Sequence, residues 1–204
     1  RYTRTFTAYL SPTNMVYFII IGAAMALIVL FNSLFPGDTG LLWYQFLLWT
    51  AVMTVGAIAI QGFFAFIIRR LPEKLFDYKR RFFRVTAREK RFYKTIGVKK
   101  WKDLVIELGM FTSFSKSKFS DPSDPAYTAR FLLESCYGVV IHISCIFTGA
   151  LAMFIYPPLT LRVGIFVAIV NAFLNILPIF VLRYNLEKIA KIHERNLRRS
   201  KKEE

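Results

Sequence analysis

Four long apolar stretches constrain this sequence more than any other feature. None has Asp, Glu or Lys well inside it, and the sequence as a whole is 55% hydrophobic. About 20 consecutive apolar residues are enough to cross a bilayer as a helix, and soluble domains do not gather their apolar residues into such blocks. We therefore predict an all-α, polytopic integral membrane protein whose four transmembrane helices form two hairpins. The stretches are Met15–Phe35, Leu41–Ile68, Cys136–Tyr156 and Leu161–Leu182.

The distribution of charge predicts how these helices are oriented. Residues 69–130 hold 17 Lys and Arg against 7 Asp and Glu, and the chain from Arg183 onward holds 8 against 4. The two short connectors between helices hold only Asp38 and Arg162. Because Lys and Arg collect on the cytoplasmic side of a membrane, we expect a multi-pass protein of the cell membrane. Both termini and the central loop would lie in the cytoplasm.

The net charge of +15 also raises the question of a nucleic-acid partner. The basic residues flank the apolar stretches, however, and there they would face anionic lipid headgroups. We therefore expect membrane lipids as partners and no nucleic acid.

The apolar and basic blocks divide the chain into four regions. Turn residues at Pro36–Gly40 and at Pro157–Pro158 predict the two hairpin connections. The regions are a lead-in with the first transmembrane hairpin (1–68), a basic loop (69–133), the second transmembrane hairpin (134–185) and a basic tail with a helical pattern (186–204).

The basic loop has a helical pattern of its own. Thr86 and Glu89 form a capping box, which marks the start of a helix, and Gly97 is placed to end that helix. Aromatic residues interleaved with Lys and Arg are typical of a helix in the membrane interface. The alternative is a charged helix of a small cytoplasmic subdomain. Apolar residues recur at roughly helical spacing at Leu75, Phe76, Phe82 and Phe83. We expect four aromatic side chains of the loop to enter the headgroup region, namely those of Phe82, Phe83, Phe92 and Trp101.

Polar side chains inside the apolar stretches are candidates for a functional site, because an unpaired polar group in hydrocarbon is costly. Gln61, His142 and Asn175 each lie eight residues from a charged residue that marks the cytoplasmic end of their helix. Eight residues of helix span about 12 Å, so the three are expected at one depth. Asn171 shares a helix face with Asn175, and Glu134 lies at the cytoplasmic mouth of the third helix.

Two interpretations of these polar residues stay open. Asn and Gln often form hydrogen bonds between transmembrane helices, and this structural role is the simpler reading of Gln61. A histidine titrates near neutral pH and is suited to moving protons, which favours a functional role for His142. His193 is expected to be a surface residue of the tail helix.

The sequence gives no support for a metal or a cofactor. Cys136 and Cys145 would stand about 13 Å apart along one helix, which is too far for a disulfide. There are two histidines in all, and no Cys/His pairs occur at the spacing of metal ligands. A glycine-rich phosphate loop is also missing. We therefore expect no metal and no cofactor.

Several short motifs resemble the glycosyl-4,4'-diaponeurosporenoate acyltransferases, which act late in staphyloxanthin-type carotenoid synthesis. The resemblance covers about Lys79 to Leu186 and lies first in the stretch Arg88–Lys102, continued by Asp103 and Leu104. The third apolar stretch resembles the Glu…His pattern of that family, and the fourth resembles its Asn-x-x-Pro and Arg-Tyr-Asn patterns. The matching residues are Glu89, Phe92, Tyr93, Trp101, Lys102, Asp103, Glu134, His142, Asn175, Pro178, Arg183, Tyr184 and Asn185.

The resemblance implies transfer of a fatty acyl group to a sugar hydroxyl of a glycosylated isoprenoid. It thus implies an amphiphilic acceptor and an acyl donor. His142 would be the general base, with Glu134 orienting it. Substrate binding would fall to Asn175, Asn171, Gln61, Arg183, Trp101 and Lys102. The alternative is a non-catalytic membrane subunit or scaffold, whose basic aromatic loop binds anionic lipid or a protein partner in a membrane complex.

Three positions depart from the pattern of that family. Ile106 stands where Pro is expected, Leu182 where Gln is expected, and Leu186 where Arg is usual.

Overall fold

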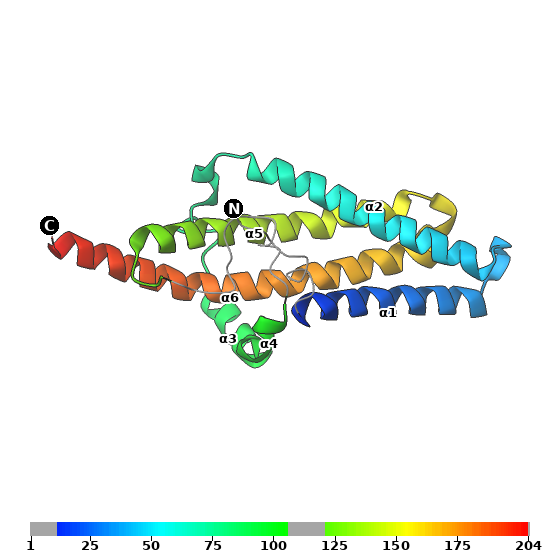
Figure 1. The fold of residues 1–204 in the computed structure, drawn as a ribbon, viewed down its shortest axis with the longest axis horizontal. Helices are drawn as coiled ribbons and strands as arrows, with labels where there is room; N and C mark the ends of the chain where they lie inside the picture. Colours follow the sequence, from blue (N-terminus) through cyan, green and yellow to red (C-terminus); the bar gives the residue numbers. More distant parts are fainter. Residues whose placement is uncertain (1–11, 106–120, 204) are drawn as a thin grey trace, which may run out of the picture. The chain divides into compact units, whose positions relative to one another are not determined.

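The computed structural model of this protein describes residues 12–105 and 121–203, and its regular elements in those ranges are all helical (Figure 1). Ile106, where the sequence departs from the family pattern, lies outside the described residues. Short 3₁₀ or π turns join the longer helices. The α-helices are α1 (Pro12–Leu34), α2 (Trp43–Arg69), α3 (Ala87–Thr95), α4 (Val98–Trp101), α5 (Pro125–Ala150) and α6 (Ile165–Glu203).

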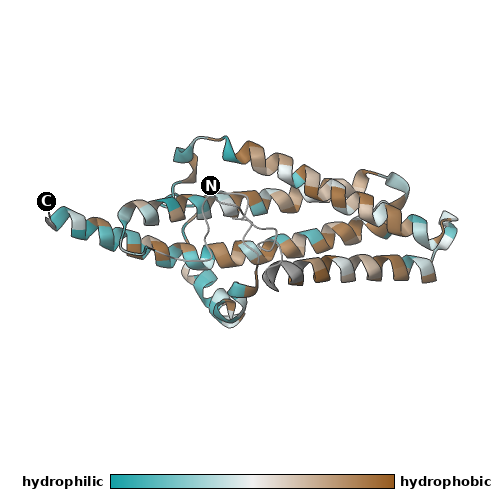
Figure 2. Cartoon of the chain, in the orientation of Figure 1, coloured by the Kyte–Doolittle hydropathy of each residue, from teal (hydrophilic) through white to brown (hydrophobic). Residues whose placement is uncertain are grey.

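Three helical segments in the described part of the chain are long and apolar enough to cross a membrane. They are Trp43–Arg69, Pro125–Phe154 and Pro157–Lys202, and a shorter apolar segment covers Phe18–Leu34. Figure 2 shows hydrophilic residues gathered on α3 and on the C-terminal part of α6. The predicted all-helical class and the last three apolar stretches are therefore confirmed, and the span of the first stretch stays a prediction.

The chain divides into two compact units, and α2, α5 and α6 each contribute a segment to both. The first unit comprises residues 1–65 and 144–175. Its core joins Ile28, Phe46, Met53, Leu159, Val163 and Val167. Trp49 and Tyr156 stack beside this core with ring centroids 4.1 Å apart. The outer faces of its helices are apolar and exposed, as at Phe18 and Leu27, which suits a surface that meets lipid.

Arg162 ties the two hairpin connections of the first unit together. Its Nη1 donates to the carbonyl of Phe35 at 2.6 Å, and its own carbonyl accepts from Asn32 Nδ2 at 3.0 Å. Gly37, at φ 57°, lies so close that a Cβ there would overlap the Arg162 guanidinium. Glycine is needed at this turn for both its conformation and its lack of a side chain.

The second unit comprises residues 66–143 and 176–204. Here α5 and α6 run antiparallel, because residues near the start of α5 meet residues near the end of α6. Asn196 Nδ2 donates to the Pro122 carbonyl at 2.8 Å, and Thr128 Oγ1 lies 2.9 Å from His193 Nδ1. His193 is only 8% exposed. The prediction that it is a surface residue is therefore wrong: it packs against α5.

The basic loop begins its main helix where the sequence indicates. Thr86 Oγ1 accepts from the Glu89 amide and Glu89 Oε2 accepts from the Thr86 amide, so the capping box is confirmed. Gly97, at φ 65°, follows the last turn of α3, and its amide donates to the Lys94 carbonyl at 3.2 Å. This closes the helix as predicted.

The segment before α3 differs from the helical pattern expected for it. A short 3₁₀ turn covers Glu73–Phe76, and residues 77–86 form turns and extended chain. The Asp77 carboxylate accepts from the Lys79 amide at 2.9 Å, a local bond that competes with helix formation. Phe82 is exposed but Phe83 is 3% exposed. Phe83 is thus a core residue, and the prediction that it enters the headgroup region is wrong.

A partly buried ion pair attaches α3 to α6 within the second unit. Arg183 Nε donates to Glu89 Oε1 at 2.7 Å, and its two terminal nitrogens donate to the carbonyls of Phe82 (2.9 Å) and Arg84 (3.2 Å). The Arg183 side chain is 13% exposed and that of Glu89 is 29% exposed. Bonds of this charged kind are stronger than neutral ones, so this pair fixes where the loop lies on α6.

Tyr93 completes the same network. Its hydroxyl donates to Glu89 Oε1 at 3.2 Å, and its ring packs against Phe180 with centroids 5.8 Å apart. Burial, and next the Glu89 charge, raise the pKa of Tyr93 to about 12. The hydroxyl therefore stays protonated and available as a donor at physiological pH.

The Glu89–Arg183 pair should make the stability of the protein depend on pH. Burial alone would raise the pKa of Glu89, but the hydrogen bonds from Arg183 and the Thr86 amide outweigh it, so the pKa lies below its ordinary value of 4.5. A depressed carboxyl pKa stabilises the fold above the unfolded value and loses that effect as pH falls through the folded value. Thermal unfolding of the detergent-solubilised protein should show this loss below pH 4.5.

The variant Glu89→Gln tests the cause. It should cost about 2 kcal/mol at pH 7, the scale of a hydrogen bond to a charged group, and it should flatten the pH dependence. Glu73→Gln is the matched control, because Glu73 is 68% exposed and pairs with Arg130 at 3.7 Å. Equal pH dependence in the wild type and the Glu89 variant would contradict this account.

Candidate functional site

Three amide side chains form a hydrogen-bonded cluster within the first unit. Gln61 Nε2 on α2 donates to Asn171 Oδ1 on α6, and Asn171 Nδ2 donates to the Cys145 carbonyl of α5 at 3.0 Å. Asn175 Nδ2 donates to both the backbone and the side-chain oxygen of Asn171, each at 3.0 Å. The prediction that Asn171 and Asn175 share a face is confirmed, and Gln61 joins them.

Gly149 makes room for this amide cluster. A Cβ at position 149 would lie 2.4 Å from both Asn171 Nδ2 and Gln61 Nε2. A glycine on α5 thus lets two amide groups from neighbouring helices pack against its backbone. The arrangement links α2, α5 and α6 by polar bonds, which is the structural role that amides commonly have between transmembrane helices.

Glu134 is a fully buried carboxylate in the second unit, with 1% of its side chain exposed. Its Oε2 accepts from Arg69 Nη1 at 3.1 Å and its Oε1 from Arg130 Nη2 at 2.7 Å. Two arginines offset the cost of burying one negative charge. Because Arg69 ends α2 and Glu134 belongs to α5, this pair also joins the two helices inside the second unit.

His142 lies two turns further along α5 and is 7% exposed. His142 is eight positions after Glu134, which amounts to about 12 Å of helix, so the regular rise of α5 sets the distance between the two. A buried imidazole in the apolar part of a helix is suited to accepting a proton from a substrate hydroxyl. The sequence predicted both residues as candidates.

The remaining predicted site residues have local or structural partners. Arg183 belongs to the network with Glu89. Trp101 Nε1 donates to the Ile96 carbonyl at 3.0 Å, and Lys102 Nζ pairs with Asp103 at 2.6 Å. Trp101 and Lys102 thus contact residues of their own short segment.

Glu89 and Tyr93 are motif positions in the sequence, but the ion pair that joins Glu89 to Arg183 could not be predicted from it. The capping box accounts for Glu89 by its bonds to the nearby Thr86. It gives no sign of the second partner of Glu89, Arg183, which is 94 residues away. Leu182 and Leu186, where the sequence departs from the family pattern, are 5% and 2% exposed. Their apolar side chains belong to the interior of the second unit.

The residues that the structure describes offer no group of three or more metal-ligating side chains. What they do offer is a histidine, a carboxylate held by arginines, and amide groups that donate hydrogen bonds. Such groups are suited to proton transfer and to stabilising a developing oxyanion.

Comparison with known proteins identifies the family. No curated protein and no solved structure matches the chain. The profile of the glycosyl-4,4'-diaponeurosporenoate acyltransferases matches residues 72–195, which is more than half of the 204 residues. Membership implies an acyltransferase of carotenoid biosynthesis, with a glycosyl carotenoid acceptor and an acyl donor. The chain therefore belongs to the glycosyl-4,4'-diaponeurosporenoate acyltransferase family.

Proposed function

We propose that this protein transfers a fatty acyl group to a hydroxyl of a glycosylated isoprenoid within the membrane. The observation that carries the proposal is the position of two buried polar residues on α5, His142 and Glu134, inside the segment that the family profile matches. An amphiphilic acceptor would lie in the leaflet with its sugar at the interface. Its hydroxyl would then reach a residue placed below the cytoplasmic surface.

His142 is the proposed general base. It would accept the proton of the acceptor hydroxyl as the oxygen attacks the acyl carbonyl, and it would return the proton to the leaving group. The new ester bond forms as the bond from the acyl carbon to the donor breaks. Glu134, held by Arg69 and Arg130, is proposed to orient the site from the cytoplasmic end of α5.

The amide groups of Gln61, Asn171 and Asn175 are proposed to bind substrate. Each carries N–H donors of the kind that stabilise an oxyanion. Arg183, Trp101 and Lys102 would bind substrate at the cytoplasmic side. Four transmembrane helices, with both termini and residues 69–130 in the cytoplasm, complete the proposal and agree with the excess of Lys and Arg in that loop.

A non-catalytic membrane subunit or scaffold is the second candidate function. The amide cluster favours it, because Gln61, Asn171 and Asn175 bond to one another and to the Cys145 carbonyl. In that case the polar residues hold helices together, and the basic loop binds anionic lipid or a protein partner.

The two histidines of the chain provide a matched test of the catalytic role. His142→Gln should lower the rate of acyl transfer roughly 10²–10⁴-fold, the usual contribution of a general base, while the protein stays folded. His193→Gln should spare acyl transfer and lower thermal stability, because the equally buried His193 lies outside the proposed site and its imidazole bonds to Thr128 of α5. Transfer is measured by mass spectrometry of the esterified product. A His142 variant that unfolds more easily yet retains transfer would favour the scaffold.

Cysteine labelling tests the proposed orientation. The native Cys136 and Cys145 are 0% and 5% exposed, so they should react little with the labelling reagent. In intact cells, a membrane-impermeant maleimide should label Asp38→Cys and should spare Ser123→Cys until the cells are opened. Both positions are exposed in the structure, so accessibility alone does not distinguish them. Labelling of position 123 from outside would overturn the orientation.

A further inference from the structure

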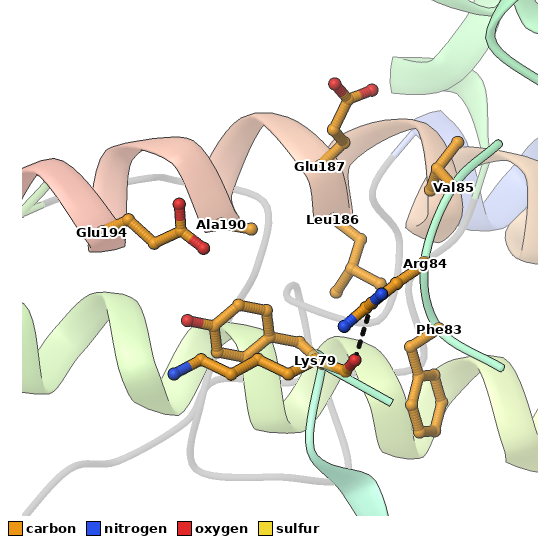
Figure 3. A pocket seen from close by; sticks show the side chains of 9 residues that line it. Lys79, Phe83, Arg84, Val85, Leu186, Glu187, Ala190 and Glu194 are labelled. Carbon is orange, nitrogen blue, oxygen red and sulfur yellow. Dashed lines mark hydrogen bonds between the residues drawn. The ribbon is translucent and has the colours of Figure 1, made fainter. Parts of the chain in front are cut away.

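A cavity of about 450 Å³ lies within the second unit, apart from His142 and Glu134. One side is formed by the segment that precedes α3, and the other by the part of α6 that follows Arg183 (Figure 3). Its lining combines basic, aromatic and aliphatic side chains. Lys79 and Arg84 supply the positive charge, and Phe83 and Leu186 supply apolar surface.

The two basic residues of the cavity are not neutralised by a carboxylate. Within the described residues, no acidic group lies within ion-pair distance of Lys79 or Arg84. Arg84 Nε donates to the Lys79 carbonyl at 2.8 Å, which orients its guanidinium and leaves the terminal nitrogens for a ligand. The Arg84 carbonyl in turn accepts from Arg183, so the ion pair with Glu89 also fixes the backbone of this site.

The acidic residues of the lining do not cancel this positive charge. Glu187 pairs with Lys90 at 2.7 Å and with Lys191 at 2.8 Å. In Figure 3 its carboxylate points away from Lys79 and Arg84, whereas Leu186 points toward them. Glu194 is the other acidic residue of the lining. Two basic residues against one unpaired acid leave a surplus of positive charge facing the cavity.

The rest of the lining is neutral and largely apolar. The Tyr78 hydroxyl is buried and has no hydrogen-bond partner among the described residues. Burial, and next the charges of Glu194 and Asp77, raise the pKa of Tyr78, so its hydroxyl keeps its proton. Phe83 is 3% and Leu186 2% exposed. A ligand that suits this lining carries an anionic group and a less polar body.

We propose that this cavity binds the phosphate group of the acyl donor through Lys79 and Arg84. Arginine and lysine are the usual protein ligands of phosphate. This inference rests on the proposed acyltransferase function, which requires a donor. Two donor classes carry a phosphate: a phospholipid, and a soluble thioester of coenzyme A. The cavity would hold the phosphate while the acyl chain enters the membrane.

Binding measurements on the full chain in maltoside micelles, which carry no phosphate, test the site. The probes are coenzyme A, a short-chain phosphatidylglycerol and inorganic phosphate, each followed by thermophoresis. We expect the wild type to bind coenzyme A or phosphatidylglycerol, and the preferred probe identifies the donor class. Lys79→Gln with Arg84→Gln should weaken that binding at least about tenfold, which corresponds to 1.4 kcal/mol. Inorganic phosphate binding as tightly as both organic probes would overturn the assignment to a donor.

Two further variants control for charge and for folding. Arg88→Gln with Lys94→Gln removes the same charge from exposed positions on α3 that do not line the cavity, and it should change binding less than twofold. Ala190→Phe fills the cavity without altering charge and should reproduce the loss. Equal weakening by the α3 control would show a diffuse electrostatic effect and overturn the site.

The outcomes also separate this inference from the proposed function. Acyl transfer by a wild-type protein that binds neither organic probe would overturn the cavity site and leave the proposed function intact. Binding that Lys79 and Arg84 govern, without any transfer, would support an anion site and count against the acyltransferase.

Discussion

The backbone of a membrane-spanning segment must satisfy its own hydrogen bonds, because hydrocarbon offers no water to do so. The long helices α2 and α5 meet this requirement, and α6 does so except at Pro178, which has no amide hydrogen to donate. Polar side chains within the first unit obey the same constraint. Thr50 Oγ1 donates to the Phe46 carbonyl at 2.7 Å, and Thr54 Oγ1 donates to the Thr50 carbonyl at 2.7 Å. The amides of the cluster around Asn171 are bonded in the same way, so polar groups in the apolar helices also serve packing.

Outside the apolar stretches, the hydrogen bonds of one arginine hold the basic loop against α6. Arg183 uses three of its nitrogens on Glu89, Phe82 and Arg84. Because Glu89 also caps α3, a single carboxylate both starts that helix and attaches it to α6. The turn before α3 is held by the same arginine, and this turn carries the basic side of the cavity. The Glu89–Arg183 ion pair thus stabilises both the attachment of α3 to α6 and the backbone that lines the cavity.

Features that depend on neighbouring residues could be predicted from the sequence, and features that depend on distant residues could not. Three of the apolar stretches, the capping box at Thr86 and Glu89, and the helix end at Gly97 all follow from local patterns, and each is present. The spacing around Phe82 resembles a helix, but the Asp77 side chain stabilises a turn instead. His193 is buried by a partner 65 residues away. The candidate residues His142 and Glu134 could be found by their type, whereas the arginines that hold Glu134 required the structure.

Several motif residues have a physical role that the structure explains. Glu89, Phe92, Tyr93 and Arg183 are far apart in sequence but meet in one contact, in which Phe92 packs against Phe180 at 5.4 Å and Glu89 binds Arg183. A match to these positions therefore reports how the loop is attached to α6. His142 is not needed for that attachment, since it lies deep in α5, and it is also the residue whose chemistry suits proton transfer near neutral pH. Glu134 and Asn175 are motif residues outside that contact as well. Among these three, His142 carries the side chain that most often serves as a general base, and this chemistry is the ground on which a catalytic role is proposed for it.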